Sequence, residues 1–135
     1  MIEDGTVATL KDIAAEIATN PALRVLFLSE RFASADNFVN RIGHELNAQA
    51  PELVEKRNRY TLSVKGWDGR NPTVWAVSGR QAVAGLRVDL IVVEARYPGE
   101  LPEHFNDLHR WRLTSGGRVV FFNWDGEKGA PCTSP

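Results

Sequence analysis

A chain of 135 residues with 43% hydrophobic residues, 24% charged residues and a formal net charge of -1 fits one soluble globular domain. The near-neutral charge excludes a global electrostatic attraction to nucleic acid or to an anionic membrane, although it allows a local basic patch. The sequence has no run of about 18–20 apolar residues, the length that a membrane-spanning helix needs, so we expect no membrane association.

The first predicted element is an amphipathic helix over residues 9–20. Thr9 with Asp12 fits a capping pair at its start, and Asn20 followed by Pro21 predicts its end. The apolar positions repeat with the period of a helix and comprise Leu10, Ile13, Ala14 and Ile17. They predict one buried face.

A short apolar strand and a second helix follow. Residues 23–29 form a continuous apolar run, which is typical of a strand that is buried on both faces. We expect the helix to begin at a Ser34 cap and to end before Pro51. The charged residues 52–59 then predict a solvated connector.

The middle of the chain predicts two strands around a turn. Apolar and polar residues alternate in residues 60–64 and, less regularly, in residues 74–77, and turn-forming residues separate the two runs. A helix or loop over residues 80–87 leads to an apolar strand over residues 88–95.

The last predicted elements are a helix over residues 101–112, ended by Gly116 and Gly117, and a buried strand over residues 118–124. Three apolar strands separated by helices predict an α/β fold. We expect three layers, with a mostly parallel sheet flanked by helices and a central β-hairpin insertion.

The predicted domain covers residues 1–129, and residues 130–135 are expected to be a flexible tail. Cys132 is the single cysteine, so an internal disulfide is excluded and a reduced, cytoplasmic setting is expected.

Polar side chains at the ends of the apolar strands predict a candidate site, because ligands of open parallel sheets collect beyond the carboxyl ends of the strands. Glu94 ends an apolar run. Acids at the end of a buried strand often hold a metal ion or activate water. The other candidates are Glu30, Arg31, Arg96 and Asn123. The same residues also fit the ordinary polar ends of buried strands, and the pattern does not decide between the two interpretations.

Four segments follow one another along the chain: a strand with a helix, a two-strand insertion, an acidic strand and a closing strand. They span residues 20–46, 60–79, 84–95 and 117–129. This order resembles the ATPase core of P-loop motor proteins, especially phage terminase large subunits and related helicase-like enzymes. The resemblance implies that Glu94 occupies the position of an acid that serves Mg²⁺ or water.

Two departures from that family bear on activity. Its phosphate grip is G-x-x-x-x-G-K-[ST], but this sequence has no Gly-Lys pair, and residues 3–10 in that position offer one glycine and two acids. The family's acidic strand ends in Asp-Glu, whereas Glu94 is followed by Ala95. We therefore expect no independent ATP hydrolysis and no cofactor, with ATP and Mg²⁺ entering only if a partner completes the site. The resemblance then implies a non-catalytic protein that binds nucleic acid or a partner protein in phage DNA packaging or processing.

A second resemblance uses the same acidic strand. Residues 89–101 resemble the phosphoacceptor strand of a response-regulator receiver, in which an acid is followed by a Pro-Gly turn. This implies that Glu94 replaces the phosphoacceptor, with Ser29 and Glu30 where receivers have an acidic pair. The insertion over residues 47–72 departs from the receiver pattern, so this alternative ranks second.

Basic residues around the predicted hairpin are the best candidate contacts to nucleic acid. The set comprises Arg57, Arg59, Lys65, Trp67 and Arg70. Basic groups hold phosphates, and an exposed tryptophan can stack on a base. A solvated charged hairpin whose tryptophan packs on the sheet is the alternative, and the pattern alone favours it.

The histidines give no metal prediction. His104 and His109 are five residues apart and would diverge by about 140° on a helix, whereas a helical metal pair needs i, i+4 spacing.

A motor-type sheet begins with a strand before the phosphate loop, and only eight residues precede Thr9. We expect either a smaller sheet or an open edge that pairs with a partner protein or a second copy.

Overall fold

A computed structural model describes residues 2–65, 72–78 and 86–127. The predicted tail, residues 130–135, lies outside these ranges. The elements in chain order are α1 (Leu10–Thr19), β1 (Val25–Ser29), α2 (Phe32–Gln49), β2 (Val54–Arg57), β3 (Thr61–Val64), β4 (Val74–Ser78), β5 (Val88–Glu94), α3 (Phe105–Leu108), the 3-10 turn η1 (Arg110–Arg112) and β6 (Leu113–Phe122).

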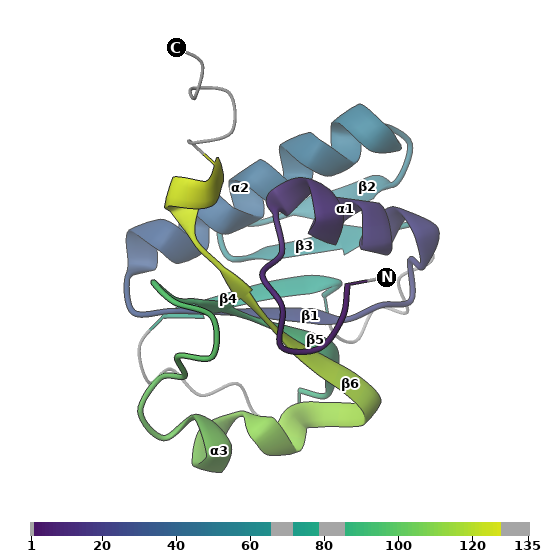
Figure 1. The fold of residues 1–135 in the computed structure, drawn as a ribbon. Helices are drawn as coiled ribbons and strands as arrows, with labels where there is room; N and C mark the ends of the chain where they lie inside the picture. The colour runs from purple at the N-terminus through teal and green to yellow at the C-terminus, as the bar shows by residue number, and fades with distance from the viewer. Residues whose placement is uncertain (1, 66–71, 79–85, 128–135) are drawn as a thin grey trace.

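The strands form one sheet of six with the order β2-β3-β4-β1-β5-β6 (Figure 1). The pairs β4–β1, β1–β5 and β5–β6 are parallel, whereas β3 pairs antiparallel with both β4 and β2. The predicted α/β class with a mostly parallel sheet is confirmed, and the predicted middle strands are the antiparallel pair β3 and β4. β1 and β5 lie at the centre of the sheet, which explains why their sequences are almost continuously apolar.

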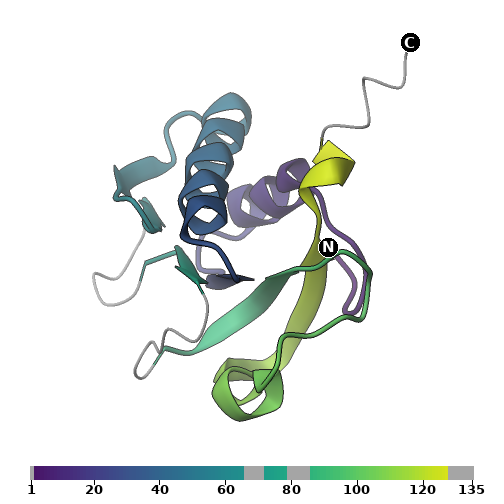
Figure 2. The ribbon, with the colours of Figure 1, turned by 90° about the vertical axis from the view of Figure 1, so that its left-hand side faces the viewer.

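Helices cover both faces of this sheet, and each face has its own apolar core. α1 and α2 pack on one face, where the rings of Phe27 and Phe38 stack with centroids 3.9 Å apart and Phe122 meets them edge-on. α3 lies across the other face, over a second core that includes Leu28 and Ile91 (Figures 1 and 2). No helix in the described part of the chain could span a membrane.

The predicted connector over residues 52–59 is wrong, because residues 54–57 form the edge strand β2. Val54 pairs with Val64 and Arg57 with Leu62. Charged residues suit an edge strand, since one side of its backbone pairs with the sheet while the other side faces solvent. The charge pattern therefore concealed a strand.

The predicted helix over residues 101–112 is also wrong in length. Only α3 and η1 form, and β6 begins at Leu113 and continues through Gly116 and Gly117, which were predicted to be the stop. Pairing with β5 at Leu113 and again from Arg118 to Phe122, with an irregularity between them, stabilises β6 more than local helix propensity stabilises a longer helix. Gly116 has φ +80°, which a residue with a side chain rarely adopts, so glycine suits this bend in the strand.

The N-terminal residues run along the outer edge of β6. The N–H groups of Gly5 and Ala8 donate to the carbonyls of Val119 and Phe121 at 2.7 and 2.9 Å, and Phe121 N–H donates to Thr6 O at 2.9 Å. Val7 forms a parallel bridge with Phe121. The chain thus covers this sheet edge with its own residues, in the position where a further parallel strand would lie.

Candidate functional site at the carboxyl ends of the strands

The parallel strands bring their carboxyl ends together at one edge of the sheet. Ser29, at the end of β1, lies beside Ser78 of β4, and Leu28 lies beside Val93 of β5. Glu94, the last residue of β5, lies beside Phe122 of β6. The predicted strand-end residues therefore belong to one region, as the parallel topology requires.

Glu94 is the centre of this region and is held by β1. Ser29 Oγ donates a hydrogen bond of 2.6 Å to Glu94 Oε1, and an Arg31 guanidinium nitrogen lies 3.7 Å from Glu94 Oε2. The Glu94 side chain is only 16% exposed. Its Oε2 is buried and accepts no hydrogen bond within the part of the chain that the structure describes. The Arg31 guanidinium near this oxygen belongs to an exposed side chain, so it compensates the carboxylate only loosely.

Arg31 is at the start of α2, where Ser34 was predicted to be the cap. The helix begins at Phe32 with Arg31 as the N-cap residue, and no side chain caps it by a hydrogen bond. Ser34 instead lies buried in the first turn, where its Oγ accepts a hydrogen bond of 3.0 Å from the Arg31 guanidinium. The predicted cap is therefore wrong: the N-cap is Arg31, three residues before Ser34, and Ser29 Oγ accepts the Arg31 N–H at 3.0 Å.

The other strand-end candidates have different surroundings. Asn123 donates from Nδ2 to the carbonyls of Ala95 and Arg96, both at 3.3 Å, so it joins the end of β6 to the loop after β5. The side chains of Glu30 and Arg96 are exposed, and the Arg96 N–H donates to Glu100 Oε1 at 3.2 Å. The region that the structure assembles is thus Ser29, Glu94 and Arg31, with Asn123 as a structural clamp beside it.

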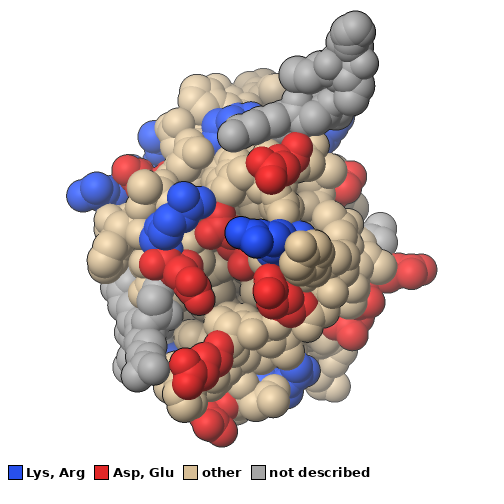
Figure 3. Space-filling model, turned by 60° about the vertical axis from the view of Figure 1, so that its left-hand side comes forward, with Lys and Arg blue, Asp and Glu red and all other residues tan. Residues whose placement is uncertain are grey.

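Acidic and basic side chains are interspersed on this face of the molecule. Figure 3, which brings the left-hand side of Figure 1 forward, shows Lys and Arg atoms mixed with Asp and Glu atoms and no uniformly basic surface. A long-range attraction for nucleic acid is therefore not supplied by this face as a whole.

Residues 3–10, which the resemblance predicted to stand at the phosphate grip, lead into α1, and carboxylates of the protein itself bind the backbone N–H groups at this helix start. The predicted capping pair is confirmed: Thr9 Oγ1 accepts from Asp12 N at 3.1 Å, and Asp12 Oδ2 accepts from Thr9 N at 3.3 Å. Leu10 N donates to Glu127 Oε2 at 3.2 Å. Two carboxylates thus bind backbone donors that an anion would otherwise approach. Sequence reasoning missed Glu127, which is 117 residues away in a segment expected to be loop, where residues 124–127 form a helical turn.

Of the five predicted nucleic-acid residues, the structure describes three, and these lie at different points along the β2–β3 pair. Trp67 and Arg70 lie outside the described residues. Arg57 packs along Gly43 of α2, and Arg59 lies 3.4 Å from Asp36. Lys65 follows β3, and its N–H bonds to the carbonyl of Leu53, at the end of the β2–β3 pair away from Arg59.

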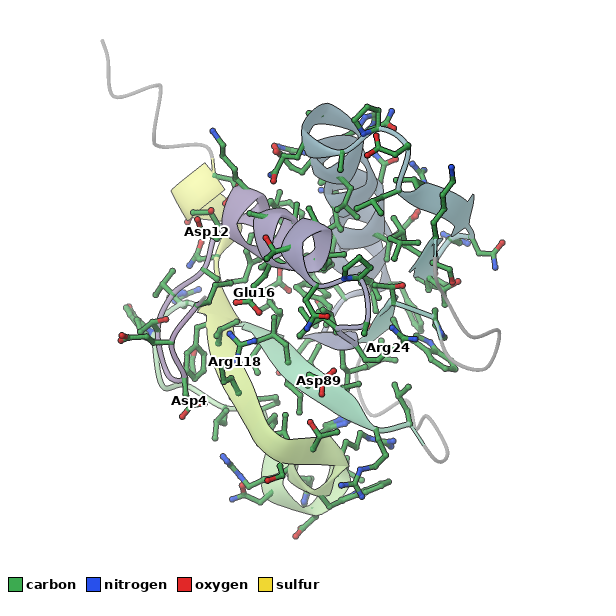
Figure 4. The ribbon with its side chains drawn as sticks, turned by 90° about the vertical axis from the view of Figure 1, so that its right-hand side faces the viewer. Asp4, Asp12, Glu16, Arg24, Asp89 and Arg118 are labelled. Atoms are coloured by element: carbon green, nitrogen blue, oxygen red, sulfur yellow. The ribbon has the colours of Figure 1, made fainter. Side chains whose placement is uncertain are left out.

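A second cluster of charges, which sequence reasoning also missed, joins α1, β6 and the N-terminal segment. Arg118 on β6 makes a bidentate ion pair with Glu16 on α1, and their side chains are 12% and 13% exposed. Glu16 Oε1 also accepts the Ile2 N–H at 2.7 Å, and Arg118 donates to the Ile2 carbonyl. The two side chains point toward one another beneath α1 in Figure 4. They form the polar wall of an open pocket of about 600 Å³.

The ion pair shifts the pKa of each partner in the direction that favours its charged form. The Arg118 hydrogen bond lowers the pKa of Glu16 against the opposing effect of burial. The Glu16 hydrogen bond raises the pKa of Arg118, with smaller contributions from Asp89 and Asp4. Each partner therefore stays charged in the folded protein, and the pair holds the N-terminal segment against the sheet.

His104 and His109 have different surroundings. The exposed His104 ring lies 3.3 Å from Glu103 and 3.9 Å from Asp107. His109 is buried, and desolvation followed by the charge of Arg112 lowers its pKa to about 4. Among the residues that the structure describes, no three His, Cys, Asp or Glu side chains could hold a metal ion together.

Comparison of the sequence with protein-family models and with curated proteins gives no match.

Proposed function

We propose that this chain is a non-catalytic relative of terminase-type and helicase-type ATPase cores, which works by binding a nucleic acid or a partner protein during phage DNA packaging or processing. Fold alone does not establish function, so the proposal depends on the state of the sites that catalysis would need. Its setting would be cytoplasmic.

The occupied start of α1 is the observation that carries the proposal. A P-loop enzyme needs free backbone N–H groups and a lysine around the phosphates. Here the capping box of Thr9 and Asp12 and the carboxylate of Glu127 bind N–H groups at this helix start. An incoming phosphate would have to displace two negative charges, which Coulomb repulsion opposes. Residues 3–6 form a turn in which the Thr6 N–H donates to the Glu3 carbonyl, and the chain from Val7 then runs along β6 to the helix start.

The engaged state of Glu94 supports the same proposal. A carboxylate that positions Mg²⁺ or water must face the nucleotide, whereas Glu94 accepts from Ser29 and lies beside Arg31. Ala95 follows it, so the second acid of the family's pair is absent from the sequence. A surface that only binds a partner needs neither a carboxylate that faces a nucleotide nor a second acid.

The experiment is a phosphate-release assay on the purified chain with ATP and Mg²⁺, run beside a nucleic-acid and protein retention assay. We expect no turnover above that of the Glu94→Gln variant, together with retention of a nucleic acid or a protein partner. Magnesium-dependent turnover that Glu94→Gln abolishes would contradict the proposal.

A weak NTPase completed by a partner is the second candidate, and the buried Glu94 Oε2 favours it. This oxygen accepts no hydrogen bond within the described residues, and a partner that moves Arg31 would free it for a cation. This candidate predicts turnover only in the complex, so the same assay repeated with the bound partner distinguishes the two. A receiver-like role of Glu94 predicts instead that Glu94→Asp changes partner binding without any nucleotide.

A further inference from the structure

We propose that the surface formed by Phe32, Tyr60, Arg59 and Arg31 binds single-stranded nucleic acid by stacking bases on Phe32 and pairing phosphates with the two arginines. We call this set the aromatic–arginine surface. The inference rests on the proposed function, since it names the ligand class of the same non-catalytic module and the place where that ligand binds.

The first observation is an exposed aromatic ring on a rigid element. Phe32 is the first residue of the 18-residue helix α2, and it is 62% exposed. Its ring centroid lies 6.4 Å from that of Tyr60, which is partly buried and packs against the main core. Tyr60 therefore fixes one side of the Phe32 ring while much of Phe32 remains open to solvent. An apolar ring of this size gains from a flat partner, and each nucleobase has a suitable face.

The second observation is the charge around the two rings. The Arg59 guanidinium lies over the Tyr60 ring, 5.2 Å from its centroid, and its side chain is 69% exposed. Arg31, adjacent to Phe32 in sequence, has a side chain that is 70% exposed. One guanidinium thus lies on the aromatic pair, and a second, which faces Glu94 of β5, belongs to the residue before Phe32. Guanidinium is the side-chain group whose fork matches phosphate oxygens.

The carboxylates nearby limit the expected affinity. Asp36 lies 3.4 Å from Arg59, and Glu94 lies 3.7 Å from Arg31. Both arginines are exposed, so these ion pairs contribute little and a phosphate can replace the carboxylate as the partner. We therefore expect weak binding that decreases steeply with salt, as phosphate contacts release counterions.

The chemistry favours a single strand over a duplex. Bases in a duplex are stacked on one another and do not offer a face to Phe32, whereas a single strand has accessible faces. The set also differs from the predicted one: only Arg59 belongs to both, and the aromatic contribution comes from Phe32 and Tyr60.

The test is fluorescence anisotropy with a labelled 20-nucleotide single strand of mixed sequence, as DNA and as RNA, at low and moderate salt. Phe32→Ala should weaken binding about tenfold, and Phe32→Leu, which keeps apolar area without the flat ring, should weaken it nearly as much. The double variant Arg31→Ala with Arg59→Ala should reduce the slope of log affinity against log salt by about one to two.

Trp111→Ala is the matched control. Trp111 is 49% exposed and also has an arginine over its ring, since the Arg112 guanidinium lies 4.4 Å from its centroid. It belongs to η1, which follows α3 in the chain. We expect this variant to bind like the unchanged protein.

Three outcomes would overturn the inference. They are equal binding by Phe32→Ala and the unchanged protein, tighter binding of a duplex of the same sequence, and capture of a protein partner through Phe32 with no single-strand binding. In each of them the proposed function survives, because it fails only on magnesium-dependent turnover. Unchanged circular dichroism of Phe32→Ala would show that lost binding is not lost folding.

Discussion

Two glutamate–arginine pairs tie the sheet to its surroundings, and they differ in almost every physical respect. Glu16 and Arg118 are nearly buried, share two hydrogen bonds and both hold Ile2. Glu94 and Arg31 lie 3.7 Å apart, and Arg31 is 70% exposed. The same two residue types therefore serve a structural role in the first pair and leave an adjustable charge at the strand ends in the second.

Removing one partner of the first pair should have the largest effect. Glu16→Ala leaves the Arg118 charge buried without its carboxylate, and breaking such a pair costs about 3–5 kcal/mol of unfolding free energy. Urea unfolding measures this loss. Replacing both residues by methionine should restore most of the stability, because neither charge is then left alone. A loss under 1 kcal/mol for Glu16→Ala would show that the two pairs are equivalent.

Acid should destabilise the protein through two buried groups away from the strand ends, His109 and Glu16. The folded-state pKa of His109 is about 4, below its ordinary value of 6.5, so its stabilising effect is complete above pH 6.5 and is lost as the pH falls toward 4. The shift corresponds to roughly 3 kcal/mol. The pKa of Glu16 is lowered from 4.5, so its contribution is lost only below pH 4.5. Urea midpoints from pH 7 to pH 3 measure both steps, and His109→Gln should remove only the first. An unchanged first step in that variant would contradict the assignment.

The starts of α1 and α2 also differ in how they are capped. α1 has a full capping box, and α2 has no side-chain cap hydrogen bond. Thr9→Ala should lower the unfolding free energy by about 1 kcal/mol, because it removes the acceptor of the Asp12 N–H. Thermal unfolding of this variant beside Arg31→Ala, which changes the N-cap residue of α2, separates the capped start from the uncapped one. If the two variants lose equal stability, Thr9 is not acting as a cap.

The second pair should give the smallest change. Arg31→Ala removes an exposed charge that lies 3.7 Å from Glu94, and pairs of this kind contribute about 0–1 kcal/mol. Glu94→Gln preserves the shape of the side chain and an acceptor for Ser29 Oγ, so its melting temperature should also change little. A large loss of stability in either variant would show that Glu94 and Arg31 also serve a structural role.

The sequence contained enough information for the class of the fold, because periodicity reports burial. The apolar runs of β1 and β5 and the stripe of α1 were predicted from it, and Thr9 with Asp12 was identified as a local cap. The extent of elements that depend on distant partners was not predicted. β2 is charged and forms because β3 pairs with it, and β6 was predicted only from residue 118, although it begins at Leu113 and continues through two glycines.

The candidate site was predictable only in part, for the same reason. Glu94 and Arg31 were identified because strand ends converge in a parallel sheet. The Glu127 bond to the start of α1 joins residues 117 positions apart, and the Arg118–Glu16 pair joins residues 102 apart. No periodicity connects such positions. An arginine in an apolar strand and a glutamate on an amphipathic helix can be recognised as an ion pair only once the structure brings them together.

Isothermal titration calorimetry with ATP and Mg²⁺ tests the central claim most directly, namely that the start of α1 is closed to phosphate by the carboxylates of Asp12 and Glu127. We predict no saturable heat at millimolar nucleotide, for the unchanged chain and for Glu94→Gln alike. Saturable, magnesium-dependent binding by the chain alone, lost in Glu94→Gln, would contradict the claim and show that a working nucleotide site exists.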